Sequence, residues 1–122
     1  MNWYIAKIVY RIICGDGNHT AQFDEQLRLI EADDYFHAFI KARQLGHREE
    51  DSFLNKQHKP VQWKFIDVTA VQFLGNLDEG AELYSRIKEK PDAAIFIKET
   101  YLRATQLMEK FSADESAAVA SD

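Results

Sequence analysis

One long run of residues decides the fold: Val61-Gln62-Trp63-Lys64-Phe65-Ile66-Asp67-Val68-Thr69-Ala70-Val71-Gln72-Phe73-Leu74. It begins as an alternation in which Val61, Trp63 and Phe65 face one way and polar side chains face the other. The apolar phase then changes after Phe65 and again after Ala70. Because side chains alternate with a period of two, a flat strand with one wet face cannot change phase. The run predicts a central strand that either bends at bulges near Phe65 and Ala70 or has apolar cover on both faces.

The N-terminal part of the chain predicts a β-hairpin. Residues 2–14 are rich in β-branched and aromatic side chains, which favour a strand. A turn with two glycines at 15–18 leads into a second strand over 20–31. The first strand has one wholly apolar face, made of Tyr4, Ala6, Ile8, Tyr10 and Ile12, and a mixed but still apolar one, made of Trp3, Ile5, Lys7, Val9, Arg11 and Ile13. On the second strand we expect the inward set to be Ala21, Phe23, Leu27 and Leu29, with Glu25 in the same phase.

Two helices and two further strands are predicted. Asp33 is a suitable N-cap for a helix over 34–45 that Gly46 ends, and its broad apolar arc predicts cover on more than one side. Residues 52–55 and 81–87 read as short strands on either side of the central one. A long helix over 91–111 carries a stripe at spacings of three and four: Ala94, Ile97, Tyr101, Ala104, Met108 and Phe111. The small and acidic segment 112–122 predicts a disordered tail.

These elements predict an α+β fold with a mostly antiparallel sheet of four or five strands, in the order ββαβββα. A chain of 122 residues is one domain by its length. We expect that domain to cover 1–111, with the sheet and first helix in 1–87 and the C-terminal helix in 91–111. The first helix is expected on one face of the sheet.

Composition narrows the functional classes. The 46% hydrophobic and 29% charged fractions are typical of a soluble globular protein, and a net charge of −5 argues against nucleic acid as a partner. The apolar run 3–14 contains Lys7 and Arg11, which argues against a membrane span or a signal-peptide core. A single cysteine, Cys14, favours a reducing cytoplasm. The four histidines lack metal-ligand spacing, and Gly15-Asp16-Gly17 lacks the rest of a dinucleotide fingerprint, so no metal or cofactor is expected.

Several short segments, in this order along the chain, resemble a small bacterial family known only as a domain of unknown function. They are Trp3-Tyr4, Arg11, Glu25, Leu29-Ile30-Glu31-Ala32, Ser52-Phe53, Asn55, Val61-x-Trp63-x-Phe65 and Gly80-x-Glu82-x-Tyr84-Ser85-Arg86. The resemblance covers about residues 1–87 and leaves out the C-terminal helix and the tail. It implies a bacterial, cytoplasmic α+β protein, and it carries over no catalytic residue.

The candidate binding residues are polar or aromatic positions on the predicted strands: Trp3, Arg11, Glu25, Tyr84 and Arg86. A carboxylate in an apolar phase must be paired or shifted in pKa, so we expect Glu25 to pair with Arg11 or Arg86. The alternatives are a structural ion pair, an edge position where Glu25 reaches water, a site for an anion or small molecule, and general acid–base chemistry. A lone glutamate is thin evidence for the last, and we predict no catalytic residue.

The second apolar face of the first strand needs cover, because monomers seldom expose such a patch. Either the C-terminal helix covers it within one chain, or a second chain does. The expected interface residues are Ile5, Val9, Ile97, Tyr101, Met108 and Phe111. The sequence therefore favours a non-enzymatic interaction module that forms a homodimer or binds a protein partner. The alternative is a small-ligand or anion-binding protein that uses the arginine, tryptophan and tyrosine end of the sheet.

Overall fold

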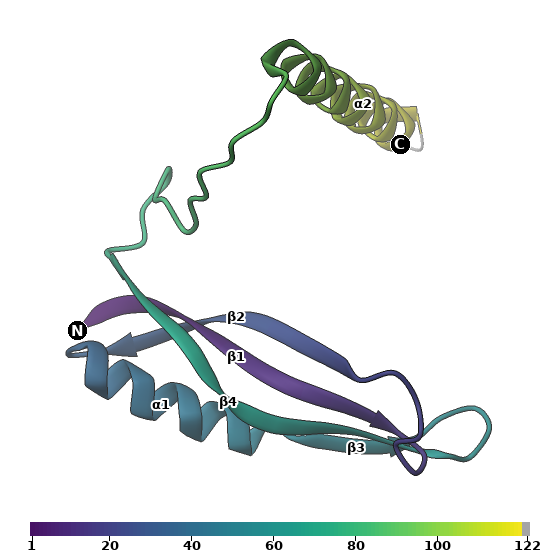
Figure 1. Ribbon diagram of the computed structural model, residues 1–122. Helices are drawn as coiled ribbons and strands as arrows, with labels where there is room; N and C mark the ends of the chain where they lie inside the picture. The colour runs from purple at the N-terminus through teal and green to yellow at the C-terminus, as the bar shows by residue number, and fades with distance from the viewer. Residues whose placement is uncertain (121–122) are drawn as a thin grey trace. The chain divides into compact units, whose positions relative to one another are not determined.

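The computed structural model describes the backbone of residues 1–120 and the side chains of residues 1–115. Its elements are β1 (Asn2–Cys14), β2 (Gln22–Ala32), α1 (Tyr35–Arg48), β3 (Asp51–Leu54), β4 (Pro60–Gly75) and α2 (Ala93–Ala120) (Figure 1). The chain divides into two compact units, which we call the sheet unit (Met1–Ser85) and the helix unit (from Arg86 onward). The predicted α+β class is confirmed.

The sheet has four strands in the order β2-β1-β4-β3, and every neighbouring pair is antiparallel. β1 is an inner strand because the β1–β2 hairpin lies on one side of it and β4 pairs along the other. Register shifts in the β1–β4 pairing leave Ile66 and Thr69 without partners on β1. These unpaired residues adjoin Phe65 and Ala70, so of the two predicted alternatives the bulges are confirmed.

The core lies between one face of the sheet and α1, which packs against β1, β2 and β4 (Figure 1). Ala38 and Ala42 on α1 are fully buried, and such small side chains let the helix approach the sheet closely. On the opposite side of α1, Phe36 is 73% exposed within the sheet unit. The prediction that this helix is covered on more than one side is therefore wrong for that unit. The buried set is Tyr4, Ala6, Ile8, Tyr10, Ile30, Ala32, Ala38, Ala42, Phe65 and Val68.

Both ends of α1 differ from the prediction. Asp34, rather than Asp33, is the N-cap, and its carboxylate accepts a hydrogen bond from the backbone N–H of His37 at 2.7 Å. The helix also continues through Gly46, which is buried against the ring of Phe65. This glycine therefore serves a tertiary contact and does not end the helix.

The face of β2 that lies against α1 is not the predicted one but the opposite one. In the register of the hairpin Tyr4 pairs with Ile30, so the even-numbered residues of β2 lie on the helix side of the sheet. The predicted inward residues Phe23, Leu27 and Leu29 lie on the other side, which we call the open face. Ala21 precedes the strand and is exposed. The register of β2 follows the pairing with β1, whose wholly apolar face supplies the core.

Two C-terminal segments also differ from the prediction. Residues 81–87 form no strand and pair with no edge of the sheet. In the helix unit α2 runs on to Ala120, so 112–120 are helical where the sequence predicted a disordered tail; the last two residues of that tail lie outside the described part. The carboxylate of Asp92 accepts a hydrogen bond from the backbone N–H of Ile95 at 3.1 Å, as expected at the start of a helix. The predicted packing of this helix on the sheet stays a prediction.

Candidate functional site

The residues singled out in the sequence do not gather in one place within the sheet unit. Trp3 and Arg11 share the open face of β1 but are eight positions apart, or about 27 Å at the usual rise per residue. Tyr84 is exposed and lies beyond the last strand, and Arg86 belongs to the helix unit. The predicted site for an anion or small molecule at these residues stays a prediction.

Glu25 faces water on the open face of the sheet. Its carboxylate lies 4.0 Å from the Nζ of Lys7, and its side chain is 63% exposed. Val9 is the direct partner of Glu25 in the register, so Lys7 and Arg11 are its two diagonal neighbours on the same face. The ion pair within the sheet unit forms with Lys7, and the expected partner Arg11 does not take part. A loose, exposed pair of this kind contributes little to stability.

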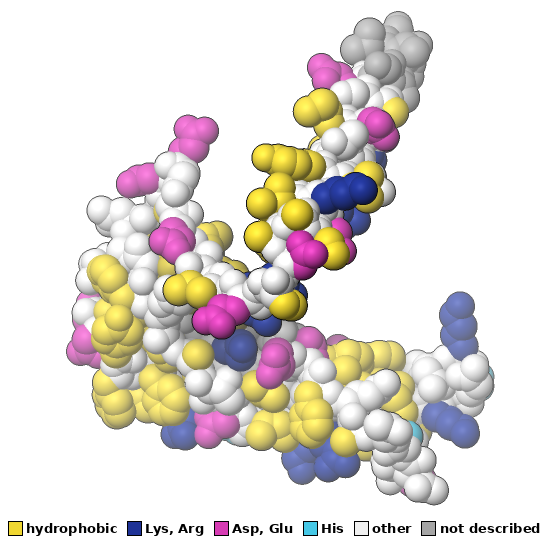
Figure 2. Space-filling model, turned by 45° about the horizontal axis from the view of Figure 1, so that its top comes forward, with side chains coloured by type: hydrophobic (Ala, Val, Ile, Leu, Met, Phe, Trp, Pro, Cys, Tyr) yellow, Lys and Arg dark blue, Asp and Glu magenta, His cyan; other side chains and the backbone are white. Residues whose placement is uncertain are grey.

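The predicted interface residues lie on exposed or half-exposed surfaces. Ile5 and Val9 are on the open face of β1, beside the apolar residues of β2. In the helix unit, Ile97, Tyr101, Met108 and Phe111 are all exposed. Figure 2 shows apolar side chains gathered along one side of that helix. Their role in association stays a prediction.

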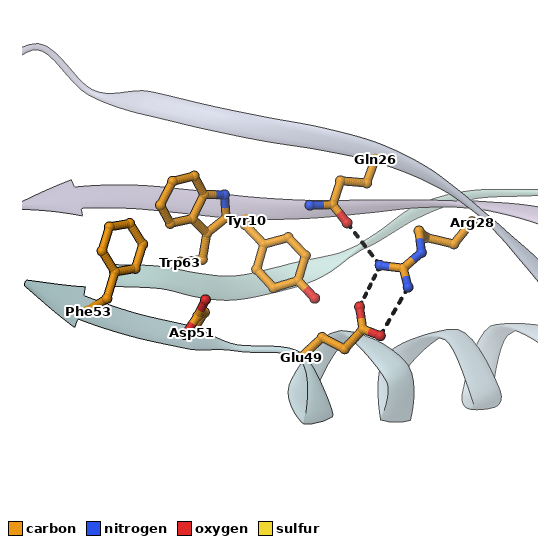
Figure 3. A pocket seen from close by; sticks show the side chains of 7 residues that line it. All are labelled: Tyr10, Gln26, Arg28, Glu49, Asp51, Phe53 and Trp63. Atoms are coloured by element: carbon orange, nitrogen blue, oxygen red, sulfur yellow. Dashed lines mark hydrogen bonds and ion pairs between the residues drawn. The ribbon is translucent and has the colours of Figure 1, made fainter. Parts of the chain in front are cut away.

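A pocket lies on the helix side of the sheet, where α1 ends and the strands continue beyond it (Figure 3). Its volume is about 280 Å³. Each of the four strands and the residue after α1 contribute side chains to it. The lining residues are Tyr10, Gln26, Arg28, Glu49, Asp51, Phe53 and Trp63.

An ion pair joins β2 to the end of α1 at one wall of this pocket. Both terminal nitrogens of Arg28 donate to Glu49, with N–O distances of 2.6 and 3.0 Å. The hydrogen bond from Arg28 holds the pKa of Glu49 below its ordinary value, and the same bond raises the pKa of Arg28. Two parallel bonds of this geometry are the strongest arrangement of an arginine and a carboxylate. The pair fixes the C-terminal end of α1 over β2.

Polar side chains continue from this ion pair across the sheet. Arg28 also donates to Gln26 at 3.1 Å, and Gln26 donates to Asp24 at 2.7 Å. The indole N–H of Trp63, two strands away, donates to the same oxygen of Asp24 at 3.1 Å. Trp63 is only partly buried, whereas Phe65, which has the same phase on β4, is buried. These hydrogen bonds fix the orientation of the indole ring at the edge of the pocket.

Tyr10 forms the floor of the pocket at the end of α1. Its hydroxyl donates to the backbone carbonyl of Gly46 at 2.9 Å, so it satisfies one of the carbonyls that a helix leaves free at its C-terminus. Burial raises the pKa of this hydroxyl, and the nearby charge of Glu49 adds to the effect. Tyr10 is therefore a neutral hydrogen-bond donor in the folded protein.

The sequence did not single out Asp24, Gln26, Arg28 or Glu49. On β2, the predicted solvent-facing side carries Asp24, Gln26 and Arg28. Glu49 belongs to a segment that the sequence indicates as a charged connector. The one available signal was the two-residue spacing of three polar side chains on a strand. That spacing places them on a single face.

The comparison with known protein families assigns the sheet unit to a family. A family described as a domain of unknown function, DUF4288, matches residues 3–85. The chain belongs to this family. The match confirms the resemblance seen in the sequence, and the DUF4288 domain covers nearly all of the sheet unit. No curated protein and no solved structure matches the chain.

Two further properties of the DUF4288 chain bear on its chemistry. None of its helices, within residues 1–120, has the length and apolar character needed to cross a membrane. The part of the chain that the structure describes also contains no group of three or more histidine, cysteine, aspartate or glutamate side chains placed to hold a metal ion.

Proposed function

We propose that the chain is a protein-interaction module that self-associates as a homodimer through the open face of its sheet. One observation carries the proposal: β2 turns Phe23, Leu27 and Leu29 away from α1, and they are 57%, 51% and 49% exposed. Ile5 and Val9 lie beside them on β1. Monomeric proteins seldom leave an apolar surface of this kind in water.

The dimensions of the open face suit a second copy of the chain. Three long strands at ~4.8 Å spacing, along the 11 residues of β2 at ~3.4 Å each, give a face of roughly 500 Å². A standard protein–protein interface takes about 800 Å² from each partner. The open face would supply most of that area. Its opposite charges, Lys7 and Glu25, also allow a two-fold-related copy to place unlike charges together.

The helix unit offers a surface that supports the same proposal. α2 has 28 residues and β1 has 13, which correspond to lengths of about 42 and 44 Å. A helix of this length can lie along a strand of the sheet over its whole extent. Its exposed apolar side, with Tyr101 and Met108, would then supply the remaining area of the interface. We propose that α2 docks on the sheet and takes part in the two-fold contact.

A reducing compartment fits this proposal. Cys14, the chain's one cysteine, is a free thiol near the end of β1. Its backbone N–H donates to the ring of His19 at 3.0 Å, which closes the β1–β2 turn without any thiol chemistry. We therefore place the module in the cytoplasm.

The test is the molecular mass of the full chain in solution, measured by light scattering. One chain has a mass of 14.1 kDa, and we expect wild type to run at twice that value at high micromolar concentration. Leu27→Asp puts a charge in the middle of the open face and should give the monomer mass. Phe36→Asp is the matched control, because Phe36 is even more exposed than Leu27 but lies on the outer side of α1. A wild-type chain that stays at 14.1 kDa would refute the proposal.

The contribution of α2 has its own pair of variants. Met108→Glu places a charge on the apolar side of the helix, whereas Gln106→Glu adds the same charge about 160° away around the helix. We expect only Met108→Glu to weaken the dimer. If Leu27→Asp leaves the mass unchanged while Met108→Glu gives a monomer, α2 alone holds the pair and the open face is not the interface.

A further inference from the structure

The pocket at the end of α1 carries no free positive charge. Arg28 is the one cation among its lining residues, and Glu49 binds both of its terminal nitrogens. Because a compensated arginine is a poor anion receptor, the pocket is not built for a phosphate or a carboxylate. Asp51 is the remaining charged residue of the lining, and it therefore determines the sign of the pocket's net charge.

Asp51 has no cationic partner within the sheet unit. Its carboxylate accepts a hydrogen bond from the backbone N–H of the next residue, Ser52, at 2.8 Å, and it takes part in none of the ion pairs of residues 1–85. Asp24 is similar, because both groups that donate to it, Gln26 and Trp63, are neutral. The C-terminal end of α1 adds a partial negative charge nearby. The pocket therefore favours a positively charged ligand.

The aromatic walls specify the kind of cation. Phe53 and Trp63 are stacked, with ring centroids 5.8 Å apart and planes inclined by 23°. Figure 3 shows the carboxylate of Asp51 between these rings and Tyr10. A planar guanidinium stacks on an aromatic face and binds a carboxylate through two parallel hydrogen bonds, which a compact ammonium ion cannot do. A volume of about 280 Å³ accepts a group of the size of an arginine side chain.

We infer that this pocket binds a guanidinium group, held by the Asp51 carboxylate and by the rings of Trp63 and Phe53. The group comes either from a free guanidino compound or from an arginine side chain on a partner protein. The inference rests on the pocket alone and is independent of the proposed dimer, which uses the opposite face of the sheet.

The chain supplies its own reporter for this site. Its two tryptophans lie on opposite faces of the sheet, Trp3 on the open face and Trp63 at the pocket. In the Trp3→Phe variant the tryptophan fluorescence comes from Trp63 alone. We expect it to change saturably with agmatine or with N-acetyl-arginine amide. N-acetyl-citrulline amide, which has the same shape but no charge, should bind roughly tenfold more weakly or worse.

A matched pair of variants in the Trp3→Phe background tests the carboxylate. Asp51→Asn should weaken binding of the arginine compounds roughly tenfold, because it removes the charge that the guanidinium pairs with. Glu31→Gln makes the same change of charge at the opposite end of β2 and should leave binding unchanged. Equal binding of the citrulline and arginine amides, or equal loss in the two variants, would overturn the inference. So would the absence of a saturable change with either arginine compound.

The two probes also distinguish the sources of the group. Binding of agmatine without the capped arginine amide would support a free guanidino compound, because a peptide backbone would then be excluded. Comparable binding of both would support an arginine side chain presented by a partner.

Discussion

Replacement of Gly46 by alanine should destabilise the sheet unit, although alanine is the better helix former. A Cβ at this position would lie 2.5 Å from Cδ2 and 3.0 Å from Cζ of Phe65, and closer still to Cε2. The ring has little room to retreat, since Tyr10 and His47 pack against it with centroid distances of 6.0 and 4.5 Å. The helix must therefore shift away from β4, or the ring must leave its rotamer.

The two opposing effects set the magnitude. Overpacking of a close contact typically costs about 1–3 kcal/mol. Removing a glycine from a helix interior stabilises the helix by about 1 kcal/mol. The difference is a lowering of the free energy of unfolding by up to about 2 kcal/mol, because the overpacking cost exceeds the gain in helix propensity. For a unit of this size each kcal/mol corresponds to a change in Tm of about 4–8 °C.

The assay is urea unfolding followed by tryptophan fluorescence. Trp3 and Trp63 both belong to the sheet unit, so the signal reports on that unit alone. The decisive comparison uses a Phe65→Leu background, where the ring is absent and alanine no longer meets it. There Gly46→Ala should stabilise the protein by up to about 1 kcal/mol, so the effect reverses its sign. A stabilising Gly46→Ala in the wild-type background would refute the close packing of α1 on β4.

Two further predictions concern the pocket and the central strand. Because Arg28 lowers the pKa of Glu49 in the folded protein, the pair stabilises the fold above the ordinary glutamate pKa of 4.5, and this contribution is lost as the pH falls through the lowered value. In urea titrations at neutral and acid pH, Glu49→Gln should therefore lose less free energy of unfolding on acidification than wild type or Glu31→Gln. Equal losses would contradict the pairing. Phe65→Ala should lower the free energy of unfolding by about 3–5 kcal/mol and Trp63→Ala by about 3 kcal/mol or less, because only Phe65 is buried. A larger cost for Trp63→Ala than for Phe65→Ala would contradict the observed packing of the strand.

The sequence predicted those structural features that depend only on neighbouring residues. The change of phase along 61–74 predicted either bulges or apolar cover on both faces, because a regular strand with one wet face cannot switch faces, and the register shifts beside Phe65 and Ala70 agree with the bulges. The turn at 15–18 predicted the hairpin, because Gly15 and Gly17 can adopt the positive φ angles of 61° and 82° that they show. Such features depend on a few neighbouring residues and can be recognised without the rest of the fold.

Features that depend on tertiary contacts could not be predicted in the same way. Glycine is a residue type that commonly ends a helix, but Gly46 is required here because the ring of Phe65, on another element, packs directly against it. Arg28 and Glu49 are 21 positions apart, and their pairing requires both the register of β2 and the place where α1 ends. The pocket is formed by five separate segments, so no single motif in the sequence reports it.

β2 shows why an apolar pattern does not identify the surface that covers it. Phe23, Leu27 and Leu29 alternate with polar residues, and the usual expectation is that such a row faces the core of its own domain. The hairpin register instead assigns the core to the other phase, through Ile30, and leaves the apolar row exposed. If the open face forms the dimer as proposed, the row is buried after all, by a second chain. The alternation on β2 would then correctly predict burial, while the pairing with β1 decides that this burial takes place between chains.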